Sequence, residues 1–307
     1  MRLEPTDDQE ALVASLRTLL ARNLPMERVR AGFDRAMHDQ LAAAGVFSLR
    51  ADGFGWADAA LVFEELGRAL VPGPIVWTHL AHGLPGGPQG VPVGGTERAA
   101  PGTLIPAFGE ALLLLGPDGV AVAPAAAVRA EPVPRPLDPL TPVVRLEAIE
   151  RADPVGDAAL AAELRRGGAL LVAATCVGIA AACQDLAVAH AQAREQFGRP
   201  VGSFQAVKHL CADMAVRTEC ARAATWAAAC TLDSGGDDPQ RAVSAAKVTA
   251  GRAAVANGRA ALQVHGGMGF TWEVDVHLYL RRAWVLDRAF GTVDEHAAAV
   301  GAALAGP

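Results

Sequence analysis

The sequence has no excess of basic charge and no leader-like segment, and each absence excludes a class of protein. Its 307 residues contain 27 Lys and Arg against 33 Asp and Glu, a net charge of −6, and the basic residues are scattered. A nucleic-acid-binding protein needs a basic patch, which this chain lacks. Residues 1–8 are acidic and contain no apolar signal region, so we do not expect export. We predict a cytoplasmic protein that binds neither nucleic acid nor membranes.

Cysteine is scarce, and the motifs of metal sites and of several common enzyme classes are absent. The five cysteines form no Cys-x-x-Cys pair and fall in apolar, helix-like segments, so we interpret them as packing residues in a reducing compartment. They are Cys176, Cys183, Cys211, Cys220 and Cys230. No Walker loop, Rossmann glycine motif or nucleophile elbow occurs. The histidines lack the i,i+4 pairing of a metal-binding helix, so we predict no metal site.

Helical periodicity governs the first 70 residues. Thr6 is a suitable N-cap for a first helix, and a second helix follows Pro25 and ends at Ala44. Asp58 opens a third helix, which the Pro-Gly-Pro segment 72–74 stops. On this third helix, Glu64 and neighbouring Glu65 are interpreted from the residues alone as part of a solvated face.

The second half of the chain also has helical periodicity. Its longest apolar run, residues 167–183, approaches the lower end of membrane-spanning length. The run is rich in Ala and Gly and continues into polar residues with the same period, so we interpret it as the buried helix of a bundle. We expect helices at 158–193, 204–233, 240–264, 273–287 and 293–304.

Between residues 84 and 157 the helical period disappears and Gly, Pro and Val increase. Residues 112–115 and 120–122 flank a Pro-Asp-Gly turn and are typical of two short strands, and residues 143–146 are typical of another. The sequence therefore predicts a mainly α protein with a small β module. We divide it into an N-terminal helical domain (1–83), a reduced middle β-domain (84–157) and a C-terminal helical bundle (158–307).

A charged, glycine-broken loop joins two of the long helices at residues 194–203. Gly198, Pro200 and Gly202 disfavour a helix there, and Ser203 supplies an N-cap for the helix that follows. Arg194 is suited to bidentate contact with a diphosphate, or equally to a salt bridge with its neighbour Glu195.

The residues that begin the helix after this loop, and the two glycines that follow the helix 240–264, can each be interpreted either as ligand-binding or as structural. Gln205 suits an adenine edge or a ribose, or equally a helix-start cap. Phe197 and Phe204 suit core packing or packing on the adenine side, and we expect the core for both. Gly266 and Gly267 follow the helix 240–264, and consecutive glycines let a pyrophosphate approach backbone N–H groups closely. A glycine C-cap gives the same pattern.

These segments resemble the acyl-CoA dehydrogenase family. In that family an Arg-x-x-Phe-Gly turn and a Phe-Gln helix start, here within 194–205, contact the FAD bound by a neighbouring subunit. The Gln-x-x-Gly-Gly-x-Gly segment at 263–269, with Arg281 beyond it, resembles the segment against that FAD's pyrophosphate, and Glu-Glu-Leu-Gly-Arg at 64–68 resembles a phrase of the first domain. The implied cofactor-binding residues are Arg194, Phe197, Gln205, Gln263, Gly266, Gly267, Thr292 and Asp294.

The same resemblance implies that the catalytic base is missing. Family members place a base Glu in a Tyr-Glu-Gly-Thr turn, and Phe290 occupies that position here. Others place the base on the long helix, at the position of Gly168. Glu163 and Asp287 are poorly placed substitutes. The middle domain is about half the usual size, and residues 123–127 and 131–136 carry few of the polar side chains that hold the flavin ring in the family.

The resemblance therefore suggests the base-lacking subunit of a heterotetrameric (α2β2) acyl-CoA dehydrogenase, similar to those of actinobacterial steroid side-chain catabolism. A partner subunit would carry the catalytic Glu and share its FAD, an acyl-CoA such as a steroid-CoA would be the substrate, and an electron-transfer flavoprotein or similar acceptor would take the electrons. Two alternatives stay open: a homomeric acyl-CoA dehydrogenase with a relocated base, and a flavin-free scaffold or dehydratase-like protein of this fold.

Overall fold

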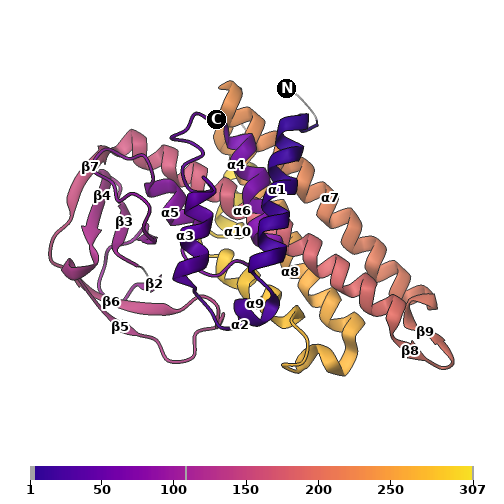
Figure 1. The fold of residues 1–307 in the computed structure, drawn as a ribbon. Helices are drawn as coiled ribbons and strands as arrows, with labels where there is room; N and C mark the ends of the chain where they lie inside the picture. Colours follow the sequence, from indigo (N-terminus) through magenta and orange to yellow (C-terminus); the bar gives the residue numbers. More distant parts are fainter. Residues whose placement is uncertain (1–3, 108, 306–307) are drawn as a thin grey trace.

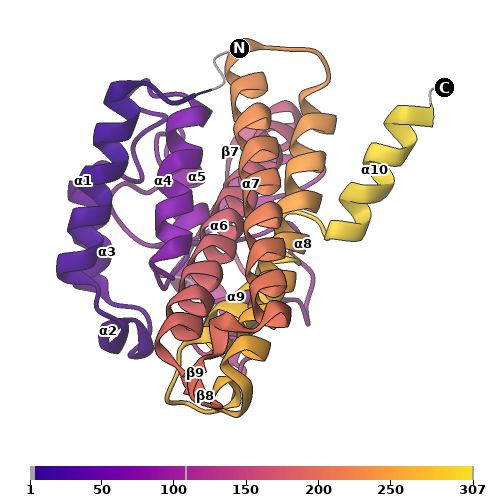
Figure 2. The ribbon, with the colours of Figure 1, turned by 90° about the vertical axis from the view of Figure 1, so that its right-hand side faces the viewer.

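Three long helices and one shorter helix form the centre of the structure, a computed structural model that describes residues 4–107 and 109–305. They are α6 (Ala158–Ala193), α7 (Gln205–Ser234), α8 (Pro239–His265) and α9 (Val276–Leu286). A last helix, α10 (Val293–Ala305), packs on α8 and projects from the bundle, as Figure 2 shows. The strands between residues 93 and 157 lie to one side of this bundle, whereas the two short strands of residues 195–200 lie at its far end (Figure 1).

The middle helix α6 is the buried helix that its apolar run predicts. It is unbroken at residues 167–168, and 78% of its most apolar 18-residue window is buried inside the protein. Small residues let the N-terminal helices approach it closely: a Cβ added at Gly178 would lie 1.9 Å from the Glu64 carbonyl oxygen, and one at Gly67 would lie 2.1 Å from that of Thr175. The helices therefore touch backbone to backbone at these glycines.

The N-terminal helices are α1 (Asp7–Asn23), α2 (Met26–Arg30), α3 (Arg35–Ala43), α4 (Trp56–Arg68) and α5 (Ile75–Ala81). Thr6 caps α1 as predicted, in a reciprocal capping box with Gln9. The single helix predicted up to Ala44 is wrong, because Gly32 adopts a φ of +90° and separates α2 from α3. Asp58 does not open α4. It is the third residue of the helix, where its carboxylate accepts the Gly55 N–H at 2.7 Å.

Of two acidic side chains of α4, Glu65 is buried and Glu64 is half-buried, and both form ion pairs, so their interpretation as a solvated face is wrong. Arg17 contacts Glu65 at 2.6 Å, and Arg222 contacts Glu64 at 2.8 Å. Burial raises the pKa of Glu64, and Arg222 opposes this effect. These pairs join α4 to α1 and α7.

The β module contains two small sheets. The first has the order β1 (Val93–Thr96), β3 (Ala111–Leu115), β4 (Gly119–Pro124), β7 (Asp153–Asp157), and β1 pairs with β3 in parallel. The second has the order β2 (Leu104–Pro106), β6 (Val143–Ile149), β5 (Val128–Pro132). The three predicted strands are found as β3, β4 and β6, and the others escaped prediction because they are short and contain Gly, Pro or charged residues. The mainly α class with a small β module is confirmed.

Candidate functional site

The loop that begins at Arg194 forms a short hairpin at one end of the bundle. Strands β8 (Glu195–Gln196) and β9 (Arg199–Pro200) pair, and Phe197 and Gly198 turn the chain with φ of +54° and +75°. Phe197 is 90% exposed, so its predicted place in the core is wrong. Its ring lies edge-on to Phe204, 6.0 Å between centroids, and the Arg199 guanidinium covers Phe204 at 4.2 Å.

The helix after the hairpin is not capped as predicted. Ser203 lies in a 3-10 turn (Val201–Ser203), and α7 begins at Gln205 after an extended Phe204. The N-cap prediction at Ser203 is wrong, because the turn carries the chain one residue further before the helix begins. Gln205 is exposed at this helix start.

The guanidinium of Arg194 is exposed and open to a ligand. Its backbone joins the hairpin to α6, since its N–H donates to the His190 carbonyl and its carbonyl accepts the Val201 N–H, both at 2.8 Å. Within residues 4–107 and 109–305, neither Arg194 nor Glu195 has an ion-pair partner. The salt bridge between them is therefore not present in this conformation.

The glycine segment that ends α8 lies next to this hairpin. Gly266 adopts a φ of +61°, and a Cβ at Gly266 or Gly267 would meet nothing within 4 Å, so both backbones are open to a ligand. The imidazole rings of His190 and His265 stack at 4.2 Å and join the end of α6 to the end of α8. Figure 2 shows the hairpin at this end of the bundle. Gln263, one turn before the glycines, is exposed.

The turn that carries Phe290 lies elsewhere, against the middle of α8. Lys247 is fully buried, and its ammonium donates to the carbonyls of Leu286, Asp287 and Gly291 at 3.1, 3.3 and 3.1 Å. His296 Nε2 lies 2.8 Å from the Phe290 carbonyl, so this nitrogen carries the proton and donates. These bonds hold Phe290 at a φ of +54°, which is costly for a bulky residue.

The Phe290 ring packs against Gly168, and these two residues are the ones that the sequence resemblance predicts at the positions of the base. The ring is 4% exposed and packs on Trp77, with 4.4 Å between ring centroids. On its other side lies Gly168, where an added Cβ would come within 2.3 Å of Phe290 Cε1. A phenyl ring cannot accept a proton, and glycine has no side chain. Neither position therefore offers a base.

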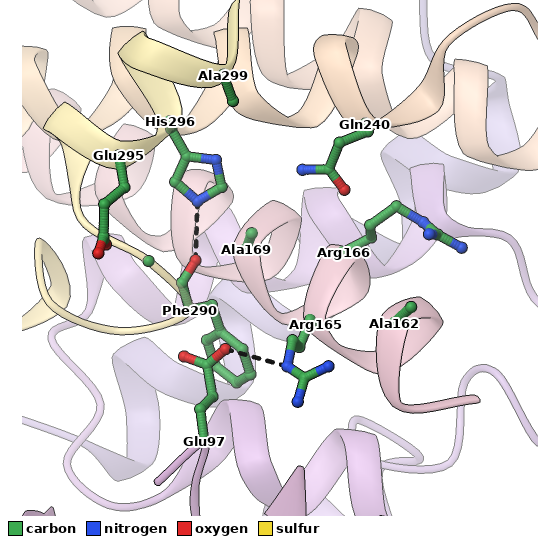
Figure 3. A pocket seen from close by; sticks show the side chains of 11 residues that line it. Glu97, Ala162, Arg165, Arg166, Ala169, Gln240, Phe290, Glu295, His296 and Ala299 are labelled. Atoms are coloured by element: carbon green, nitrogen blue, oxygen red, sulfur yellow. Dashed lines mark hydrogen bonds and ion pairs between the residues drawn. The ribbon is translucent and has the colours of Figure 1, made fainter. Parts of the chain in front are cut away.

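A cavity of about 370 Å³ adjoins Phe290 and contains carboxylates that sequence reasoning did not select. Its polar lining consists of Glu97, Arg165, Arg166, Gln240, Glu295 and His296. Figure 3 shows the Glu97 carboxylate beside the Phe290 ring, with the Arg165 guanidinium facing it at 3.5 Å. The sequence gives only a weak indication that Glu97 belongs to a site, because it is a single acidic residue after a strand that sequence patterns did not reveal. Glu163 and Asp287 do not line this cavity.

The eight predicted cofactor-binding residues fall into two separate groups. Arg194, Phe197, Gln205, Gln263, Gly266 and Gly267 surround the hairpin and the end of α8, whereas Thr292 and Asp294 lie at the start of α10. The Thr292 N–H and hydroxyl donate to Glu295 at 2.7 and 3.0 Å. Lys247 of α8 bonds to the Gly291 carbonyl beside this second group, whereas Gly266 caps the end of α8 in the first group. The two residues are 19 positions apart, or about 28 Å at 1.5 Å per residue.

Comparison with known proteins finds acyl-CoA dehydrogenases as relatives of this chain. The model of the acyl-CoA dehydrogenase C-terminal domain matches residues 160–305. Acyl-CoA dehydrogenase IpdE2 of Mycobacterium tuberculosis is 33% identical over 309 residues, which cover 92% of each chain. Acyl-CoA dehydrogenase FadE34 of the same organism is 38% identical over 261 residues, covering 74% of this chain and 35% of FadE34.

Solved structures share the fold over the whole chain. A chain of the ChsE4–ChsE5 complex from Mycobacterium tuberculosis superposes with a TM-score of 0.84 and 23% identity, over 100% of both chains. A chain of the Tcur3481–Tcur3483 steroid ACAD G363A variant gives 0.83 and 20% identity, over 97% of this chain and 98% of that one.

Proposed function

Because the chain belongs to the acyl-CoA dehydrogenase family, we propose that it is the subunit without the base in a heteromeric FAD-dependent enzyme. Members of this family depend on FAD. In the proposed assembly the chain helps to bind FAD across the interface with a partner subunit, which supplies the catalytic Glu. The complex desaturates an acyl-CoA thioester between its α- and β-carbons, and an electron-transfer flavoprotein or similar acceptor reoxidises the flavin.

The contact of Phe290 with Gly168 is the observation that carries this proposal. It leaves both family positions for the base without a carboxylate, and the packed ring leaves no space for one. The six residues around the hairpin nevertheless stay exposed, with Arg194 free of ion pairs among the described residues. Binding groups without the base are expected of a chain that completes the site of another subunit.

The hairpin group fits a dinucleotide. The Arg194 guanidinium and the open amides of Gly266 and Gly267 suit a pyrophosphate, because bidentate donors and exposed backbone N–H groups both bind phosphate oxygens. The exposed Phe197 ring offers a face for a planar group, and Gln205 and Gln263 offer amide donors and acceptors. FAD bound there would accept the hydride that leaves the β-carbon of the substrate.

The names of the structural neighbours support the finer parts of the proposal. One is a complex of two different proteins and another is a steroid acyl-CoA dehydrogenase. On this basis we propose that this chain forms an α2β2 assembly and that the substrate is a steroid-CoA. The domain division at residues 83 and 157 belongs to the same proposal.

Coexpression with a full-length acyl-CoA dehydrogenase encoded beside this chain tests the proposal. We expect colourless protein from this chain alone, and a yellow complex with dehydrogenase activity when both chains are present. Stoichiometric FAD and acyl-CoA oxidation by this chain alone would instead establish a homomeric enzyme with a relocated base. Protein that stays colourless and inactive with every partner would favour a flavin-free scaffold or a dehydratase-like role.

A further inference from the structure

Two stacked imidazole rings adjoin both features that the proposed function assigns to a diphosphate. The ring centroids of His190 and His265 are 4.2 Å apart, with 27° between the ring planes. His190 lies one helical turn before Arg194, whose N–H donates to the His190 carbonyl, and His265 directly precedes Gly266. The stack therefore lies beside the arginine and beside the start of the open glycine backbone. The proposed function gives these two rings no role.

The electrostatic surroundings of the stack are positive. Burial, and then the positive charges of His265 and Arg194, lower the pKa of His190. Among the residues that the structure describes, no carboxylate of α7, of α8 or of the hairpin opposes this effect. Glu195, which follows Arg194 in the hairpin, is exposed and forms no ion pair with it. Two imidazoles and a guanidinium without a counter-ion are suited to an anion.

The ring nitrogens of the stack are available to such an anion. His265 Nδ1 lies 2.8 Å from the Ala261 carbonyl oxygen, so this nitrogen carries the proton and donates. The other nitrogen of His265 and both nitrogens of His190 have no hydrogen-bond partner within residues 4–107 and 109–305. A ring nitrogen that gains a proton becomes a charged donor, which binds a phosphate oxygen more strongly than a neutral donor does.

The stack also lies where two helices end. Helix α6 ends at Ala193 and α8 ends at His265, so the carbonyl ends of both helices meet in this region. The negative end of a helix dipole repels an anion and stabilises a cation in the last turn. A diphosphate held here by Arg194 and the glycine amides therefore needs additional positive charge nearby. A protonated imidazole in the last turn of either helix supplies it.

We propose that the His190–His265 stack is a third diphosphate-binding group of the hairpin site and takes up one proton as the diphosphate binds. The inference rests on the proposed function, because it assumes that this site holds the diphosphate of FAD. Two stacked imidazolium ions repel each other, so the pair shares a single proton. Without a ligand the His190 ring is mainly neutral at pH 7, because its pKa lies below 6.5. A bound diphosphate supplies the missing negative charge and favours the protonated pair. The affinity should therefore be highest at low pH and fall as the pH rises.

Binding of ADP-ribose to the full chain, without FAD or partner, tests this inference at pH 5.5 and pH 8. The probe has a diphosphate diester that does not titrate in this range, and NMR signals of the histidine rings report binding up to millimolar concentration. We expect wild type to bind about tenfold more tightly at pH 5.5, since a pKa that rises by one unit on binding changes the affinity tenfold. The His190 signals should titrate at a higher pH with the probe than without it.

His190→Phe keeps a ring in the stack but carries no proton, so its affinity for ADP-ribose should be the same at both pH values. His82→Phe is the matched control, because His82 ends α5, which packs on the β module. This control should keep the wild-type pH dependence, and thermal melting should show both Phe variants folded.

Three results would overturn the inference: equal affinity of the wild type at both pH values, an unchanged pH dependence in His190→Phe, or no binding of ADP-ribose at pH 5.5. Failure of FAD sharing is a separate result, because it is read from the colour and activity of the coexpressed complex. A yellow, active complex whose chain binds ADP-ribose equally at both pH values would refute the role of the stack alone.

Discussion

A methyl group added at Gly168 should destabilise the protein only while Phe290 is present. The new Cβ would lie 2.3, 2.4 and 2.6 Å from three atoms of the Phe290 ring, whereas ordinary contacts are 3.4–4 Å. The ring would have to move by roughly 1 Å, since carbon atoms repel steeply inside their contact distance. Trp77 blocks its retreat on the other face, and Lys247 and His296 hold its backbone turn.

The expected change in the free energy of unfolding for Gly168→Ala follows from two opposing contributions. Overpacking a well-packed core costs about 1–3 kcal/mol. Replacing glycine by alanine inside a helix stabilises it by about 1 kcal/mol. Gly168→Ala should therefore lower the free energy of unfolding by up to about 2 kcal/mol, the difference between these two ranges. In a Phe290→Ala background the clash disappears, and the same change should stabilise the protein by about 1 kcal/mol.

Urea unfolding of the two single variants and the double variant measures this reversal of sign. Gly301→Ala on α10 is the control, because an added Cβ there would meet nothing within 4 Å and should simply stabilise the helix. If Gly168→Ala had the same effect in both backgrounds, the ring would not occupy the space over Gly168. The explanation for the missing base would then be wrong.

Three further predictions follow from single contacts. Arg194→Lys should weaken FAD binding by the heteromeric complex about tenfold, measured by flavin fluorescence, because Lys loses the bidentate fork, whereas Arg22→Lys on α1 should have no effect. Burial lowers the pKa of His79 from 6.5 to about 4, so the unfolded chain binds more protons between these values. Stability should fall by up to about 3 kcal/mol as the pH drops from 6.5 to 4, at 1.36 kcal/mol per pH unit, and a His79→Leu variant should lose this pH dependence in urea titrations. Lys247→Met should cost about 2–3 kcal/mol in the free energy of unfolding, because it leaves buried carbonyls of the Phe290 turn without a donor.

Local patterns in the sequence were sufficient to predict much of the fold. The helix period located α6, α7 and α8 to within about two residues, since each of these helices repeats its apolar positions over many turns. Thr6 marked its own helix start, because a cap bonds to a residue three positions away. Resemblance over short motifs was enough to predict the family, which the comparisons confirmed.

The errors occurred where contacts distant in sequence decide the outcome. Phe197 was expected in the core because an aromatic residue usually packs there, yet a hairpin turn holds it in solvent. Glu64 was expected in solvent, yet Arg222 of another helix pairs with it. Six strands, β1, β2, β5, β7, β8 and β9, were missed because each has at most five residues and gains its stability from pairing with another strand.

The sequence by itself determined which chemical groups are present: a phenyl ring and a glycine at the base positions, and an arginine and glycines suited to a dinucleotide. Only the tertiary structure decided that Phe290 covers Gly168, that the predicted binding residues form two groups along α8, and that Glu97 adjoins Phe290. The physical reason is the range of the interactions. Helix periods and caps act over a few residues, whereas close packing in the core joins side chains from opposite ends of the chain.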